Sequence, residues 1–200
     1  MERNQCIGLV VLVGIILAIL VWKYFSRESV RMSKVEEPSI PSTPPDRNNL
    51  YLDLRMQALE MPPEMFEVVP DSRRPVVYGV LMDWELGGGT ATFVSFISGD
   101  TSSYTSSGGG VIGGVGHENV RNASVALIEK AKDYIGQFVR SDDASPPRNK
   151  SVKFFLLTTQ GRFVAEEEMV DFDNGSSPLL GLFVEANKVI TELRKITPDR

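Results

Sequence analysis

The chain has 200 residues, 42% of them hydrophobic and 24% charged, and its formal net charge at pH 7 is −5. Residues 1–34 hold five Lys or Arg and two Asp or Glu, whereas residues 35–200 hold 16 basic and 24 acidic residues, a net charge of −8. A region this acidic repels phosphate backbones, which argues against a nucleic-acid partner. The length allows one ordinary domain in addition to a terminal extension.

An uncharged run, CIGLVVLVGIILAILVW, covers residues 6–22. As a helix it would measure ~26 Å, close to the ~30 Å hydrocarbon layer of a membrane, and the flanking Lys23 and Tyr24 extend the span. A cleaved secretory signal is the alternative, but the run is longer than a usual signal core and no small-x-small cleavage site follows it. We therefore expect residues 1–26 to form an uncleaved single-pass transmembrane anchor.

The residues that flank this run predict its orientation. Lys23, Arg27, Arg31 and Lys34 follow it, and positively charged flanks favour the cytoplasmic side. The sequence thus predicts a protein of the cell (inner) membrane with its C-terminal domain in the cytoplasm. A domain outside the cytoplasm is the alternative, because proteins with one N-terminal span often have that orientation. The single cysteine, Cys6, excludes a disulfide within the chain, which fits a reducing compartment.

A proline-rich linker at residues 27–48 is expected to be a semi-extended tether. It contains Pro38, Pro41, Pro44 and Pro45. A single domain is predicted over residues 49–200. Its first element is a short helix that begins after Asn49 as N-cap, places Leu50, Leu54 and Leu59 near one face, and stops at Pro62 and Pro63.

Five strands are predicted in this domain. From Val76 the apolar residues recur with a period of two, which is typical of a strand. One face would carry Val76, Tyr78, Val80, Met82, Trp84 and Leu86, and the other Asp83 and Glu85. Further strands are expected at residues 90–98, 101–107, 151–159 and 162–168, of which 151–159 is apolar on both faces and so central.

Two longer helices complete the domain, each with one apolar stripe. The stripes are Leu127, Ala131, Tyr134, Ile135 and Phe138 in the first, and Leu179, Phe183, Ala186, Ile190 and Leu193 in the second. Ser177 and Pro178 have the chemistry of an N-cap and first turn. The order α-β-β-β-α-β-β-α predicts an α+β fold with a mostly antiparallel five-stranded sheet and packed helices. This order loosely resembles the profilin and roadblock/longin-like scaffolds, and a likeness of fold implies no function.

Four segments carry a closer resemblance. VYGVLMD, TSSYTSSGGGVIGGVGHENVR, FFLLTTQGRFVAEEE and SPLLGLFVEANKVITELR, which lie between about residues 50 and 195, resemble an uncharacterised bacterial protein family. The resemblance implies a bacterial protein. It implies no activity, so no residue role is taken from it.

Glycines and hydroxyl side chains are concentrated in residues 98–117, SGDTSSYTSSGGGVIGGVGH. A segment so poor in bulky side chains serves through its backbone, in tight turns or in close approach to another group. Its glycines match the spacing G-x-G-x-x-G, but Asp133, at the distance of the acidic residue of a dinucleotide site, lies inside the next predicted helix, so no cofactor is expected. An anion or small ligand near that helix N-terminus is a less specific alternative. The candidate ligand-binding residues are Ser106, Ser107, Gly108, Gly109, Gly110, Gly113, His117 and Arg121.

His117 is the only histidine and the first candidate for a general base. With a nearby serine, and Asp100 or Glu118 to orient it, His117 could form a hydrolytic site. The simpler interpretation is a histidine that caps a helix or bonds to loop backbone. One histidine and one cysteine supply too few ligands for a metal, and the acidic segment 171–175 lacks the spacing of a calcium loop. We therefore expect no catalytic set and no metal.

Two classes of function remain open. The first is a membrane-tethered, non-catalytic protein-interaction or assembly module, whose partner is another protein or a second copy of the chain. An acidic immunity-type protein that blocks a basic toxin belongs to this class. The second is a small-ligand-binding or hydrolytic domain that uses residues 98–117. A sheet edge formed by these residues would favour the first class, and a pocket with His117 inside it would favour the second.

Overall fold

The computed structural model describes residues 47–196, with side chains from Leu50 onward. The predicted anchor at residues 6–22 and almost all of the linker lie outside the described residues, so the anchor, its orientation and the domain boundaries stay predictions. Within residues 47–196, no helix has the length and apolar character that a membrane crossing requires.

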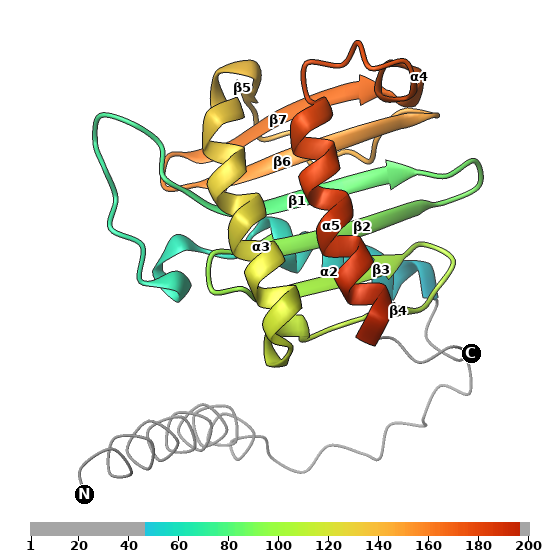
Figure 1. The fold of residues 1–200 in the computed structure, drawn as a ribbon, viewed down its shortest axis with the longest axis horizontal. Helices are drawn as coiled ribbons and strands as arrows, with labels where there is room; N and C mark the ends of the chain where they lie inside the picture. The colour runs from blue at the N-terminus through green and yellow to red at the C-terminus, as the bar shows by residue number, and fades with distance from the viewer. Residues whose placement is uncertain (1–46, 197–200) are drawn as a thin grey trace, which may run out of the picture. The chain divides into compact units, whose positions relative to one another are not determined.

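An antiparallel seven-stranded sheet forms the middle of the fold (Figure 1). The strands are β1 (Val77–Glu85), β2 (Thr90–Phe96), β3 (Thr101–Thr105), β4 (Gly110–Val111), β5 (Val139–Arg140), β6 (Ser151–Thr158) and β7 (Gly161–Glu168). Their order across the sheet is β4-β3-β2-β1-β6-β7-β5. The α+β class and the antiparallel sheet are confirmed. The sheet has seven strands where five were predicted, because β4 and β5 have two residues each and are too short to show a periodic pattern.

Helices cover both faces of this sheet (Figure 1). One face carries α3 (Glu118–Ala131), the 3-10 helix η3 (Lys132–Gln137) and α5 (Leu180–Ile196). The other face carries α2 (Arg47–Leu59) and the 3-10 helix η1 (Pro63–Phe66). Two short elements, η2 (Gly114–Gly116) and α4 (Met169–Asp173), precede α3 and α5 respectively.

Two hydrophobic clusters hold these layers together, one on each face of the sheet. Every residue of β6 is buried, as the apolar character of both its faces predicted. The stripes predicted for α3 and α5 also pack in the core. Some of these residues lie outside the two α-helices: Tyr134 and Ile135 are in η3, Phe138 packs into the core just ahead of β5, and Leu179 directly precedes α5.

Strand β1 departs from its predicted alternation at Tyr78. The pairing with β6 shifts between Val77 and Gly79, so a bulge adds one residue to β1. Tyr78 therefore packs in the cluster beneath α2, whereas Val80 packs beneath α3 and α5. The prediction that Tyr78 and Val80 share a face is wrong for this reason.

The buried stripe of α2 also differs from the predicted one. Leu50 is 55% exposed, and the buried positions are Tyr51, Arg55, Ala58 and Leu59. These residues follow the spacing i, i+4, i+7, i+8 of one helix face. The stripe was missed because it includes Arg55, a charged residue that is buried only when it has a partner.

Candidate functional site

The glycine-rich segment, residues 98–117, forms one edge of the sheet. It contributes β3, a turn at residues 105–109, β4 and η2. In the turn, the Thr105 N–H donates to the Gly109 carbonyl at 3.1 Å, and the Gly108 N–H donates to the Thr105 carbonyl at 2.9 Å. Gly108 and Gly109 have φ values of 95° and 94°, which residues with a Cβ rarely adopt. The glycines are thus required by the hairpin that carries β4.

Gly110 has a different reason to be glycine. A Cβ at this position would collide with the carbonyl oxygen of Ser103 and lie 2.8 Å from the Cα of Tyr104. The absence of a side chain therefore allows β4 to approach β3 closely enough to pair with it.

A groove of about 440 Å³ lies between this edge and α2. From α2 it is lined by Leu50, Tyr51 and Leu54, and from the sheet edge by residues 103–105, residues 108–110 and Ile112. None of these residues is charged. Ile112 is 71% exposed, and with the exposed Leu50 it gives the groove an apolar surface that faces water.

Two tyrosines of the groove lining use their hydroxyls within the fold. The rings of Tyr51 and Tyr104 meet edge to face with centroids 6.1 Å apart. The Tyr51 hydroxyl bonds to Thr92 Oγ1 at 3.0 Å, and the Tyr104 hydroxyl donates to the Leu54 carbonyl at 3.1 Å. Burial, and after it the charge of Asp83, raises the pKa of both tyrosines, so both remain neutral. These rings add apolar area to the groove and no free acid or base.

Beneath α2, a row of polar side chains crosses the sheet in register. Thr92, Asp83, Lys153 and Glu166 are neighbours on β2, β1, β6 and β7. Asp83 accepts hydrogen bonds from Arg55 Nε at 2.8 Å and from Thr92 Oγ1 at 2.5 Å. Burial raises the pKa of the Asp83 carboxyl, and the adjacent Arg55 charge opposes that shift. This pair attaches α2 to the centre of the sheet.

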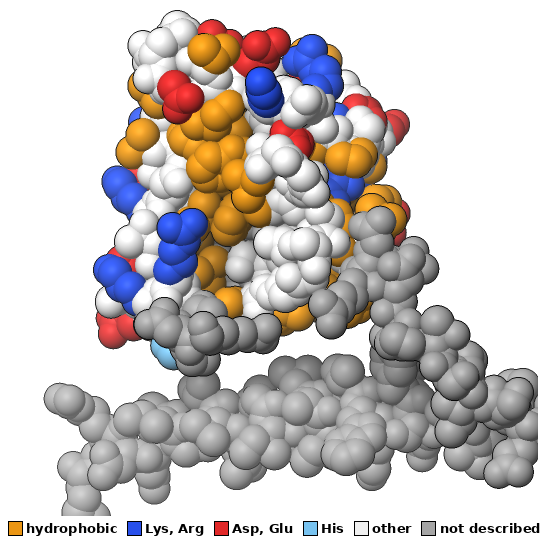
Figure 2. Space-filling model, turned by 90° about the vertical axis from the view of Figure 1, so that its right-hand side faces the viewer, with side chains coloured by type: hydrophobic (Ala, Val, Ile, Leu, Met, Phe, Trp, Pro, Cys, Tyr) orange, Lys and Arg blue, Asp and Glu red, His pale blue; other side chains and the backbone are white. Residues whose placement is uncertain are grey.

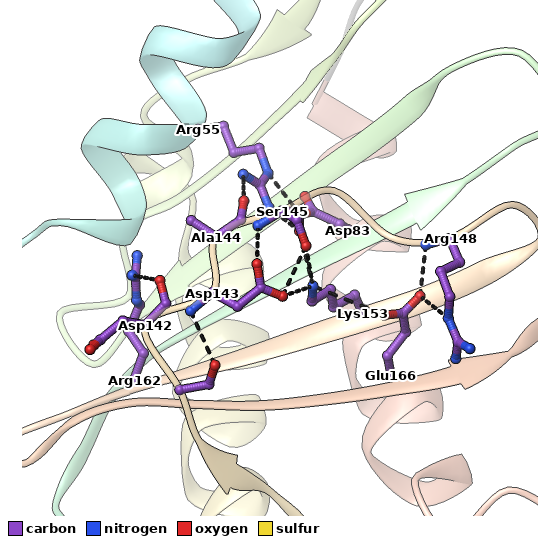
Figure 3. A network of polar contacts seen from close by, with 11 residues as sticks. Arg55, Asp83, Asp142, Asp143, Ala144, Ser145, Arg148, Lys153, Arg162 and Glu166 are labelled. Atoms are coloured by element: carbon purple, nitrogen blue, oxygen red, sulfur yellow. Dashed lines mark hydrogen bonds and ion pairs between the residues drawn. The ribbon is translucent and has the colours of Figure 1, made fainter.

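The loop at residues 141–150 completes this polar row (Figure 3). Arg55 Nη1 donates to the Ala144 carbonyl at 2.7 Å, and Lys153 Nζ donates to Asp143 Oδ2 at 2.8 Å. The hydrogen bond from Lys153, together with two from Ser145, holds the pKa of Asp143 well below its usual range. Because the buried charges of the row are matched by opposite charges, the row fits a structural role, with no free general acid or base.

The predicted ligand-binding residues do not converge on one site. Gly108, Gly109 and Gly110 line the groove. Ser106 Oγ accepts a hydrogen bond from the Thr90 N–H at 3.0 Å, and Ser107 is exposed on the turn. Both serines are therefore next to the groove and absent from its lining.

The remaining predicted residues, Gly113, His117 and Arg121, lie where η2 leads into α3. His117 occupies the N-cap position of α3 without a side-chain hydrogen bond, and it lines a separate shallow hollow with Glu192 and Lys195. Arg121 packs over Gly99. Within residues 50–196, no serine hydroxyl bonds to His117 and no group of acidic or histidine side chains could hold a metal.

A second apolar surface lies where β1 turns into β2. Leu86 and Val170 are exposed there, and Figure 2 shows hydrophobic side chains gathered along this side of the molecule. The hollow between them is also lined by the charged residues Glu85, Lys150, Glu168 and Asp173. The groove beside β4 is thus the uncharged one of the two.

Comparisons with protein-family models, with curated proteins and with solved structures find no match to this chain. The resemblances noted in its sequence therefore stay predictions, and its function is argued from its own residues. The sequence alone indicated the glycines of the groove. It did not indicate the α2 wall, because Leu54 and Tyr104 are 50 positions apart and meet only in the fold.

Proposed function

We propose that this protein is a membrane-tethered, non-catalytic interaction module that binds a protein partner at the β4 edge of its sheet. One observation carries the proposal: the glycine-rich segment ends the sheet as an uncharged edge beside an apolar groove. The cores of protein interfaces are similarly poor in charge and rich in apolar and aromatic side chains.

Exposed apolar side chains at this edge support a protein partner. Ile112 and Leu50 both project into water on the rim of the groove. Contiguous exposed apolar surface on a soluble domain commonly marks an interaction site.

The chemistry of the surrounding residues favours binding over catalysis. The hydroxyls of Tyr51 and Tyr104 are engaged within the fold, and His117 belongs to a different hollow. Asp83 is bound to Arg55 beneath α2. The groove therefore offers shape and apolar area, which suit recognition of a partner.

The predicted anchor at residues 6–22 supplies the tether. The predicted linker precedes α2, which begins at Arg47 and whose Leu50, Tyr51 and Leu54 line the groove. Attachment to the membrane would raise the local concentration of a partner that is also at the membrane.

Two matched substitutions test this function. Ile112 and Val139 are both 71% exposed and lie near opposite edges of the sheet. We expect Ile112→Lys in the full chain to lower the amount of co-purified partner by about ten-fold or more, since a lysine in the apolar contact must be desolvated. Val139→Lys should leave the partner unchanged, as measured by quantitative mass spectrometry of the affinity-purified protein.

Retention of the same partners by Ile112→Lys would contradict the proposed function. Loss of function in a folded His117→Ala variant would instead support the ligand-binding or hydrolytic alternative.

A further inference from the structure

The outer side of β4 has unused backbone hydrogen-bonding groups. Ser103 pairs with Val111, and the Thr105 N–H donates to the Gly109 carbonyl. Bonds between antiparallel strands alternate, so Gly110 and Ile112 direct their N–H and C=O groups away from β3. Outside the pairing of β4 with β3, no hydrogen bond joins another described residue to the backbone of Gly110 or Ile112.

Apart from the short length of β4, which has two residues, this edge has few of the features that usually prevent a strand from being added. Proteins protect exposed edges with charged side chains, prolines or covering segments. Residues 105–116 contain no charge and no proline, and Gly109 and Gly110 are exposed. Within residues 47–196, the edge is thus open to the backbone of another chain.

The groove lies where the side chains of an added strand would project. Gly110 and Ile112 lie on the α2 side of the sheet, as does Tyr104, and all three line the groove. The groove leaves space beside Tyr104 and Leu54 for an apolar side chain from the added strand. A lysine or glutamate placed there would be buried beside uncharged residues without a partner, which is costly.

From these observations we infer that the partner binds by adding an extended strand to β4, with uncharged, apolar side chains on the face that enters the groove. This inference rests on the proposed function and specifies how the same edge recognises its partner. Main-chain hydrogen bonds to the edge give affinity, and pockets for alternate side chains give specificity, in this mode of recognition.

The test uses the full chain and a displayed library of short random peptides as the probe. Strand addition predicts that the selected peptides are uncharged at every second position and rich in aliphatic and β-branched residues. Their affinity is then compared for the wild type, Ile112→Ala and Ile112→Pro. The proline variant lacks the outward N–H, whereas the alanine variant keeps it.

Relative to the wild type, we expect the affinity for the selected peptides to fall about ten-fold or more in Ile112→Pro and about three-fold in Ile112→Ala. Val139→Lys should bind them like the wild type. Amide hydrogen exchange of the unmodified chain provides a measurement that needs no variant. Peptide binding should slow exchange at Gly110 and Ile112 and leave Arg140, at the other edge, unchanged.

Four results would overturn strand addition. These are selected peptides with charged residues at every second position, equal affinity for Ile112→Pro, unchanged exchange at Gly110 and Ile112, and no peptide enriched. Self-association of the chain that Ile112→Lys abolishes would assign the edge to a second copy and overturn the assigned partner. If a cellular partner requires Ile112 while the peptide tests fail, the proposed function stands and the strand-addition mode is wrong. If no cellular partner depends on Ile112, the proposed function itself is wrong.

Discussion

At one edge of the sheet, β4 is short, uncharged and glycine-rich, and it borders an apolar groove under α2. At the other edge, β5 contains Arg140, and β7 beside it ends in the glutamates at positions 166–168. The loop at residues 141–150 follows β5 and is held to the sheet through Lys153. Both edges end in two-residue strands, yet only the second has the charges that discourage pairing with another chain. The difference suggests that the β4 edge is the one used for recognition.

The polar row beneath α2 crosses β2, β1, β6 and β7 between these edges, and removal of Asp83 should have the largest effect on stability. Asp83→Ala would leave Arg55 buried without its counter-charge, so we expect the free energy of unfolding to fall by about 3–5 kcal/mol. Chemical denaturation measures the loss. Asp53→Ala, which removes an exposed acidic side chain of α2, serves as the control. It should change the free energy of unfolding by less than about 0.5 kcal/mol. A loss below about 1 kcal/mol for Asp83→Ala would show that this ion pair does not hold α2 in place.

A smaller effect is expected for Gly110→Ala, which acts on the β4 edge alone. The added methyl group would press on the carbonyl of Ser103 and separate β4 from β3, at a cost of about 1–3 kcal/mol. Gly136→Ala is the matched control, because Gly136 has open space around its Cβ position. Thermal unfolding of both variants measures the difference. Equal melting temperatures would mean that β4 does not require the close approach seen in the structure.

The charged edge should respond to pH through Asp143. Its pKa is lowered in the folded protein, chiefly by the hydrogen bond from Lys153, so below the usual carboxylate value of about 4 the unfolded state binds more protons. The contribution of Asp143 is therefore complete above that pH and is lost as the pH falls further. Since its side chain is 52% exposed, we expect Asp143→Asn to lower the free energy of unfolding by about 1 kcal/mol at neutral pH.

That difference between wild type and Asp143→Asn should shrink steadily as the pH falls below about 4. Denaturation curves across the acidic range measure it. A difference that grows toward low pH would contradict the assigned ion pair with Lys153.

The smallest change is expected at His117. Its side chain is exposed and makes no capping hydrogen bond, so His117→Ala should alter the free energy of unfolding by less than about 0.5 kcal/mol. It should also leave partner binding at the β4 edge intact. Loss of binding in the folded variant would show that the hollow lined by His117 and the groove beside β4 act together, and would contradict their separate roles.

Local patterns predicted much of this fold. The apolar alternation of Val80 and Met82 placed β1, and the continuous apolar run of 151–159 placed β6 inside the sheet. The bulge at Tyr78 could not be predicted in this way, because it depends on the register with a strand about 80 positions later. Two-residue strands also show no periodic pattern in a sequence, because β4 and β5 are defined only by their pairing.

The site was also predictable only in part, because a local pattern does not show which distant residues meet in the fold. Glycines at 108–110 indicated a segment used for its backbone, and the structure places them on the groove. His117 and Arg121 are near them in sequence but lie elsewhere in the fold. The α2 wall could not be foreseen, because Arg55 and Asp83 each look like a surface charge until they are brought together.

We propose that the β4 edge, and not the β5 edge, contacts the partner. The most direct measurement places a photo-crosslinking amino acid at position 112 or at position 139 of the full chain in cells. Ile112 and Val139 are both 71% exposed, so the two positions are equally accessible to a partner. We predict a crosslinked adduct with a discrete partner from position 112 and none from position 139. Adducts of equal yield from both positions, or from position 139 alone, would contradict the account.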